Sequence, residues 1–136
     1  MRHITTFNTA KHHIYLKPTL IDGNGVPQFF RAILDSGAPK SEFSDRFLHA
    51  VKILHEEEML SVPVPEGLQT RKYTSVVIPH IECLGQTLKN ISVIVSKFEE
   101  HWGIDALIGL DFFRQFEVAI NYKKGQIITE PLELTI

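Results

Sequence analysis

The sequence has a single cysteine and no long apolar run. Cys83 stands alone among the 136 residues, which excludes an intramolecular disulfide and a zinc site built from several cysteines of one chain. No segment approaches the roughly 18 consecutive apolar residues of a membrane-spanning helix. Residues 1–20 also lack the apolar stretch of a secretory signal. We therefore expect a reducing, cytoplasmic setting and no membrane partner.

The sequence also lacks an excess of charge of either sign. Lys and Arg number 14 and Asp and Glu number 16, which gives a formal charge of −2. Without a basic field to hold a phosphate backbone, nucleic acid is not an expected partner. Hydrophobic residues make up 43% and charged residues 22% of the chain, as in ordinary globular proteins. The length fits one domain, residues 1–136.

Several common catalytic motifs are missing. The Gly-x-Ser-x-Gly elbow of serine hydrolases is absent. The pair His12-His13, and His80 with Cys83, lack third and fourth ligands at the spacing of a metal site. The glycines of residues 22–25 join two β-prone runs and indicate a turn rather than a phosphate loop. We predict neither a metal nor an organic cofactor.

Short β-prone runs separated by turn residues fill most of the sequence. They predict three hairpins: 13–21 with 26–34, 73–82 with 88–96, and 118–122 with 126–129. Ser44 and Asp111 can each cap a short helix. Pro63, Pro65 and Gly67 favour a projecting loop or irregular hairpin over residues 59–73. The pattern is that of an all-β domain with short helices.

Asp35 is the first candidate for chemistry. It ends an apolar run and begins Asp35-Ser36-Gly37-Ala38. Its carboxylate should therefore have little contact with solvent in a tight turn, where an isolated charge is costly. Asp before Gly often caps its own turn, and a catalytic carboxylate takes the same place. This segment alone leaves both interpretations open.

A second apolar segment supplies the context for Asp35. Its motif residues are Leu107, Ile108, Gly109 and Asp111, with a glycine where one strand packs closely across another loop. The two motifs, in this order, resemble those of the retropepsin-like aspartic proteases, the single-lobe proteases of retroviruses, retroelements and related cellular proteins. The similarity extends from about Tyr15 to Thr129. It implies a closed, barrel-like, all-β fold with short helices.

The resemblance implies a role for each residue of the first motif. Asp35 matches the catalytic aspartate, Ser36 the hydroxyl residue that links the two active-site loops, Gly37 the tight turn, and Ala38 the small residue beside the substrate. One chain carries one such aspartate, so the implied active form is a symmetric homodimer that pairs two copies of Asp35.

The implied activity is that of an aspartic endopeptidase. The paired carboxylates share a proton, and water is the nucleophile, so no cofactor is implied. The implied partner beyond a second subunit is an extended peptide or protein substrate. The alternative is a retropepsin-like module that dimerises or binds peptides with little or no turnover, because fold does not guarantee function.

The chain departs from the retroviral pattern at the dimer interface and in the flap. Pro39 and Leu110 occupy positions where retroviral members carry an Asp and an Arg in a buried ion pair. Exchange of both partners for apolar groups is compatible with a retained fold and a different interface. The flap candidate at Pro65, Glu66 and Gly67 is poorer in glycine than usual. Residues before Tyr15 and residues 131–136 are expected to help form the dimer.

Overall fold

The computed structural model describes residues 1–54, 60–66 and 69–132. Its strands are β1 (His3–Thr6), β2 (Tyr15–Leu16), β3 (Thr19–Ile21), β4 (Pro27–Phe29), β5 (Ala32–Leu34), β6 (Glu42–Ser44), β7 (Leu60–Glu66), β8 (Gln69–Cys83), β9 (Gln86–Ser96), β10 (Ala106–Ile108), β11 (Phe116–Asn121) and β12 (Gln126–Pro131). Its helices are α1 (Asp45–Ala50), the 3-10 turn η2 (Glu100–Trp102) and α2 (Leu110–Phe113). Among the described residues, no helix is long and apolar enough to cross a membrane.

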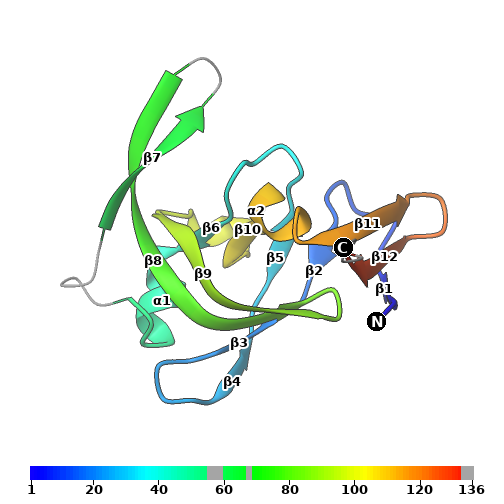
Figure 1. Ribbon diagram of the computed structural model, residues 1–136, viewed down its shortest axis with the longest axis horizontal. Coiled ribbons are helices and arrows are strands. Elements are labelled where there is room, and N and C mark those ends of the chain that lie inside the picture. Colours follow the sequence, from blue (N-terminus) through cyan, green and yellow to red (C-terminus); the bar gives the residue numbers. More distant parts are fainter. Residues whose placement is uncertain (55–59, 67–68, 133–136) are drawn as a thin grey trace, which may run out of the picture.

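The strands form two sheets. The larger has the order β2-β5-β10-β6-β9-β8-β3-β4, with β7 paired to β8. Figure 1 shows the long strands β8 and β9 sweeping past the short central strands, so that this sheet curls into a half-barrel. The smaller one, which we call the terminal sheet, has the order β1-β12-β11 and lies to one side of the half-barrel (Figure 1). The all-β class with short helices is confirmed.

The first predicted hairpin exists but each of its strands is broken in two. β3 pairs with β4 around the predicted turn, where the Asp22 carboxylate accepts the Val26 N–H at 2.8 Å and the Asn24 N–H at 2.8 Å. Beyond the breaks at residues 17–18 and 30–31, β2 pairs with β5. β5 therefore stays paired with β2 on one side, and on its other side it pairs in parallel with β10.

The second and third predicted hairpins are also present. β8 pairs with β9 from Ser75↔Ile94 to Cys83↔Gln86, and β11 pairs with β12 from Phe116↔Pro131 to Asn121↔Gln126. β8 begins at Gln69, well before the predicted start at residue 73, whereas the ends of the other three strands lie within about two residues of the prediction. Residues 60–66 form a regular strand, β7, paired with β8, where the sequence favoured a loop or an irregular hairpin. The β7–β8 hairpin projects from the half-barrel (Figure 1).

The two predicted helices form, but only one is capped as expected. The Ser44 hydroxyl accepts the Phe47 N–H at 3.4 Å and begins α1, as predicted. The expectation that Asp111 caps the second helix is wrong, because Gly109 is the N-cap of α2 and provides no side chain. Asp111 lies inside the first turn of α2, and its carboxylate bonds to Ser41 instead.

The hydrophobic core is built mainly from the large sheet and the two α-helices. Fully buried side chains come from strands of the large sheet and from both α-helices: Leu20, Phe43, Leu48, Ile78, Ile81, Val93, Ile108 and Phe112. Phe30, Phe43 and Phe47 pack as an aromatic cluster with ring centroids 5.3 to 6.4 Å apart. Cys83 is buried in the same core. This packing fixes the strands β5 and β10, which carry the two motifs.

Candidate active site

The two sequence motifs meet in the middle of the large sheet. β5 and β10 are parallel neighbours, with Ala32 opposite Ala106 and Leu34 opposite Ile108. The Asp35 N–H continues this ladder by donating to the Ile108 carbonyl at 2.8 Å. Parallel strands end at the same edge of a sheet, so the Asp35 loop (residues 35–41) and the start of α2 lie against each other.

The Asp35 carboxylate takes part in its own turn and remains partly exposed. Its Oδ1 accepts the Gly37 N–H at 3.0 Å, and the Asp35 carbonyl accepts the Ala38 N–H at 3.2 Å. The Asp35 side chain is half-buried, whereas Ser36 and Gly37 are exposed. The carboxylate is thus held by the backbone in a position that an outside group can reach.

The two motif glycines differ in what surrounds them. A Cβ built on Gly109 would lie 2.7 Å from the Ala38 carbonyl oxygen and 2.9 Å from the Lys40 carbonyl carbon. A Cβ on Gly37 would meet, within 4 Å, only Asp35 Oδ1 at 3.4 Å. Gly109 therefore allows the close approach of two loops, while the space above Gly37 is open.

Hydrogen bonds join the Asp35 loop to the start of α2. The Leu110 N–H donates to the Ala38 carbonyl at 2.8 Å, and the Gly109 N–H donates to the Ser41 hydroxyl at 2.9 Å. Ser41 Oγ in turn donates to Asp111 Oδ1 at 2.8 Å. Sequence reasoning missed Ser41; the available signal was a small hydroxyl residue between an Asp-Ser-Gly turn and the next apolar run.

A row of apolar side chains flanks Asp35. Ile33 pairs with Tyr15 on one side and with Leu107 on the other, so these three share a face of the sheet. Side chains alternate along a strand, which places Asp35 on the same face as Ile33. Ile33 and Leu107 are half-buried and Tyr15 is 44% exposed, whereas Ala32 and its neighbours across the sheet are buried. The accessible surface beside the carboxylate is therefore apolar.

The flap candidate lies in the β7–β8 hairpin. Pro65 pairs with Thr70 and Glu66 pairs with Gln69 at the end of the described part of the hairpin. Gly67, the third residue of the flap candidate, lies outside the described residues.

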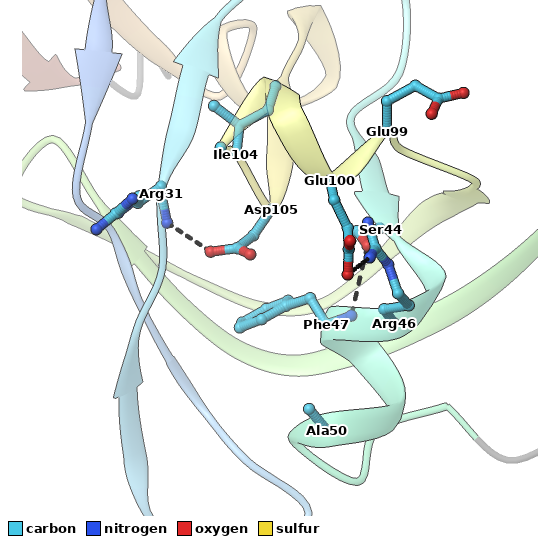
Figure 2. A pocket seen from close by; sticks show the side chains of 10 residues that line it. Arg31, Ser44, Arg46, Phe47, Ala50, Glu99, Glu100, Ile104 and Asp105 are labelled. Atoms are coloured by element: carbon cyan, nitrogen blue, oxygen red, sulfur yellow. Dashed lines mark hydrogen bonds and ion pairs between the residues drawn. The ribbon is translucent and has the colours of Figure 1, made fainter.

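A cavity of about 450 Å³ lies at the opposite end of β5 and β10 from Asp35. Figure 2 shows Asp105 reaching the start of β5, where its carboxylate accepts the Arg31 N–H at 2.9 Å, and Arg46 beside Glu100 in an ion pair. Asp35 does not line this cavity. Asp105 thus holds the start of β5 beside the start of β10 and does not contribute to the Asp35 loop.

The fold has known counterparts among solved structures. The crystal structure of a retropepsin-like aspartic protease from Rickettsia conorii superposes with a TM-score of 0.65 at 15% sequence identity, over 95% of this chain and 89% of that one. The retroviral protease-like domain of Ddi1 from Leishmania major has a TM-score of 0.55 at 17% identity, over 90% and 97% of the two chains. This chain has the retropepsin-like fold. No family model and no curated protein sequence matches the chain.

The retropepsin-like fold confirms the resemblance inferred from the motifs. At these sequence identities the likeness concerns the fold. The chemistry of Asp35 has to be argued from the site itself.

Proposed function

We propose that the protein is an aspartic endopeptidase whose active form is a homodimer. The observation that carries the proposal is the accessible Asp35 carboxylate at the end of β5, held by the Gly37 N–H and flanked by an apolar surface. A carboxylate placed by backbone contacts keeps its position without help from flexible side chains. Such placement is what acid–base catalysis requires.

The chemistry needs two carboxylates. One Asp35 of each subunit would share a single proton, because two like charges within hydrogen-bond distance do not both ionise readily. The ionised carboxylate would remove a proton from a water molecule as that water attacks the peptide carbonyl. The protonated one would polarise the carbonyl oxygen, and a proton would then pass to the leaving amine.

The substrate class follows from the surface beside Asp35. An extended peptide that lies along the row of Tyr15, Ile33 and Leu107 would bury an apolar side chain next to the scissile bond. The apolar row supports a preference for hydrophobic residues there. The alternative function, a module that binds extended peptides with little or no turnover, uses the same surface.

The deciding experiment is the substitution Asp35→Asn. The amide keeps an oxygen that can accept the Gly37 N–H, so the turn should survive while the ionisable group is lost. We expect peptide hydrolysis to fall by at least about 1,000-fold, with the fold and self-association unchanged. Hydrolysis is measured on a fluorogenic library of extended peptides, and association by sedimentation.

The matched control is Asp105→Asn. It makes the same acid-to-amide change at the far end of the same strands and keeps an acceptor for the Arg31 N–H, so hydrolysis should persist. Equal activity of the Asp35→Asn variant and the unmodified protein would reject the assignment of Asp35. Peptide binding with no hydrolysis by the unmodified protein would favour the binding module.

A further inference from the structure

Ser41 is a buried residue with every polar group in use. It is 1% exposed and lies six positions after Asp35, at the far end of the Asp35 loop. Its Oγ donates to Asp111 Oδ1 at 2.8 Å and accepts the Gly109 N–H at 2.9 Å. Its N–H donates to Asp111 Oδ2 at 3.0 Å, and its carbonyl accepts the Ile94 N–H at 2.9 Å.

Asp111 completes this arrangement from the first turn of α2. Its two oxygens receive the Ser41 hydroxyl and the Ser41 N–H, and Oδ1 also accepts the Phe112 N–H at 2.9 Å. Two hydrogen bonds thus run from one residue of the Asp35 loop to one carboxylate, so the Ser41–Asp111 pair is a two-point link between the loop and α2.

The loop is secured at three points along its length. The Asp35 N–H bonds to Ile108, the Ala38 carbonyl bonds to Leu110, and Ser41 bonds to both Gly109 and Asp111. The first two are backbone contacts that any sequence could make. The third depends on a hydroxyl that donates and accepts at once, so it is specific to these side chains.

We propose that Ser41 and Asp111 are positioning residues for the Asp35 carboxylate. Neither belongs to the apolar row, and both act through the loop backbone. The proposal rests on the proposed function, in which Asp35 carries the chemistry. Reacting groups displaced by about 1 Å lose on the order of 100-fold in rate, so loosening one end of a seven-residue loop should reduce turnover.

Variants of Ser41 and Asp111 distinguish the effect of the Ser41 hydroxyl from the effect of side-chain size. Ser41→Ala removes the hydroxyl and leaves the Gly109 N–H and Asp111 Oδ1 without it, whereas Ser41→Thr keeps a hydroxyl that can make both hydrogen bonds and adds one methyl group. Asp111→Asn replaces one of two acceptor oxygens by an NH₂ group. In either orientation of the amide, this NH₂ group faces a backbone N–H, that of Ser41 or that of Phe112, which then loses its acceptor. Ser41→Ala and Asp111→Asn should therefore reduce turnover to a similar extent, and Ser41→Thr should behave like the unmodified protein.

Two measurements follow on the same variants. On the fluorogenic peptide library, we expect Ser41→Ala and Asp111→Asn to lower kcat by about 10- to 100-fold with KM changed less than about threefold, and Ser41→Thr to stay within about threefold of the unmodified protein. By amide hydrogen exchange, the N–H groups of Gly37 and Ala38 should exchange at least about tenfold faster in the first two variants. The amides of β8 and β9 should keep their protection.

The two readouts distinguish failure of this proposal from failure of the proposed function. If the unmodified protein and Asp35→Asn are equally inactive, the proposed function fails, and exchange at Gly37 and Ala38 still decides whether Ser41 and Asp111 hold the loop. If the unmodified protein is active and Ser41→Ala keeps both its kcat and its protected loop, the positioning role is rejected. Faster exchange across β8 and β9 as well would also reject it, because the effect would then be global destabilisation.

Discussion

Two aspartates on the same pair of strands show how placement decides what a carboxylate can do. Asp105 accepts the Arg31 N–H at the base of β5, and Asp35 accepts the Gly37 N–H in the turn beyond its other end. Both are half-buried, and each accepts a backbone N–H. Only Asp35 lies beside the apolar row of Tyr15, Ile33 and Leu107. The two side chains are chemically identical, so the surface beside each one is what makes Asp35 a catalytic candidate and Asp105 a structural contact.

Cys83 allows a prediction about pH at the residue scale. Burial raises the pKa of its thiol from 9.0 to about 12, because the thiolate would lose its hydration in the core. Between those values the unfolded chain releases a proton that the folded chain keeps, so stability falls as the pH rises through 9. Relative to a Cys83→Ala variant, the unmodified protein should lose on the order of 1 kcal/mol of unfolding free energy between pH 7 and pH 10.

Urea titrations of both proteins at the two pH values measure this difference. Titration of lysines and tyrosines is common to both chains and cancels in the comparison. The native thiol should also resist alkylation at pH 8 and react only after unfolding. If the difference in unfolding free energy between the two proteins is the same at pH 7 and at pH 10, burial does not raise the pKa of the thiol.

At the scale of elements, the contact between β10–α2 and the Asp35 loop depends on a missing side chain. Gly109 has an ordinary backbone conformation, with φ −105°, so its absence of a Cβ matters only for packing. The neighbouring atoms are carbonyl groups of Ala38 and Lys40, which belong to the backbone and cannot swing away. The loop must therefore shift if any larger residue replaces Gly109.

We expect Gly109→Ala to destabilise the fold by about 1–3 kcal/mol, as overpacking of a tight contact does. Gly37→Ala is the matched control, because its Cβ would make one contact of ordinary length and its backbone needs no left-handed conformation. Thermal and urea unfolding measure both variants. Equal stability of the two would indicate that the loops separate freely and that the contact does not constrain Asp35.

The prolines of β7 are a second feature at this scale. Pro63 pairs with Lys72 and Pro65 with Thr70 in the β7–β8 hairpin. The two prolines are two residues apart, so their backbone nitrogens point to the same edge of β7. Proline has no N–H to donate, so the hydrogen bonds between β7 and β8 are complete only when this edge faces away from β8. The outer edge of β7 therefore lacks two donors, which limits pairing with another strand.

At the scale of the whole molecule, buried polar contacts join the terminal sheet to the half-barrel. Thr129 of β12 is fully buried, and its hydroxyl donates to the Leu84 carbonyl at 2.6 Å in the β8–β9 turn. Gln86 Nε2 donates to the Thr129 hydroxyl at 3.4 Å and to the Met1 carbonyl at 3.1 Å. His3 of β1 lies directly against Gly85 in the same turn. The β8–β9 turn thus contacts both β1 and β12 of the terminal sheet.

We expect Thr129→Val to lower the unfolding free energy by about 1–3 kcal/mol, because the isosteric change leaves the Leu84 carbonyl and the Gln86 amide without the hydroxyl. Thr129→Ser keeps the hydroxyl and should cost less, chiefly through the lost methyl group. Urea unfolding gives the two values. If Val is tolerated as well as Ser, the terminal sheet is held by apolar packing and by β-pairing alone.

The local features of this protein could be predicted from its sequence alone. Its turns, its β-prone runs and the Ser44 cap depend on neighbours in the chain, and the order of the two apolar motifs was enough to indicate the retropepsin-like fold. Tertiary structure decided what depends on distant neighbours. β5 pairs in parallel with the distant strand β10, and Asp111 bonds to Ser41, 70 residues away, rather than capping its helix. A local pattern contains no information on such partners, because the energy of a long-range contact is set by how the whole chain closes.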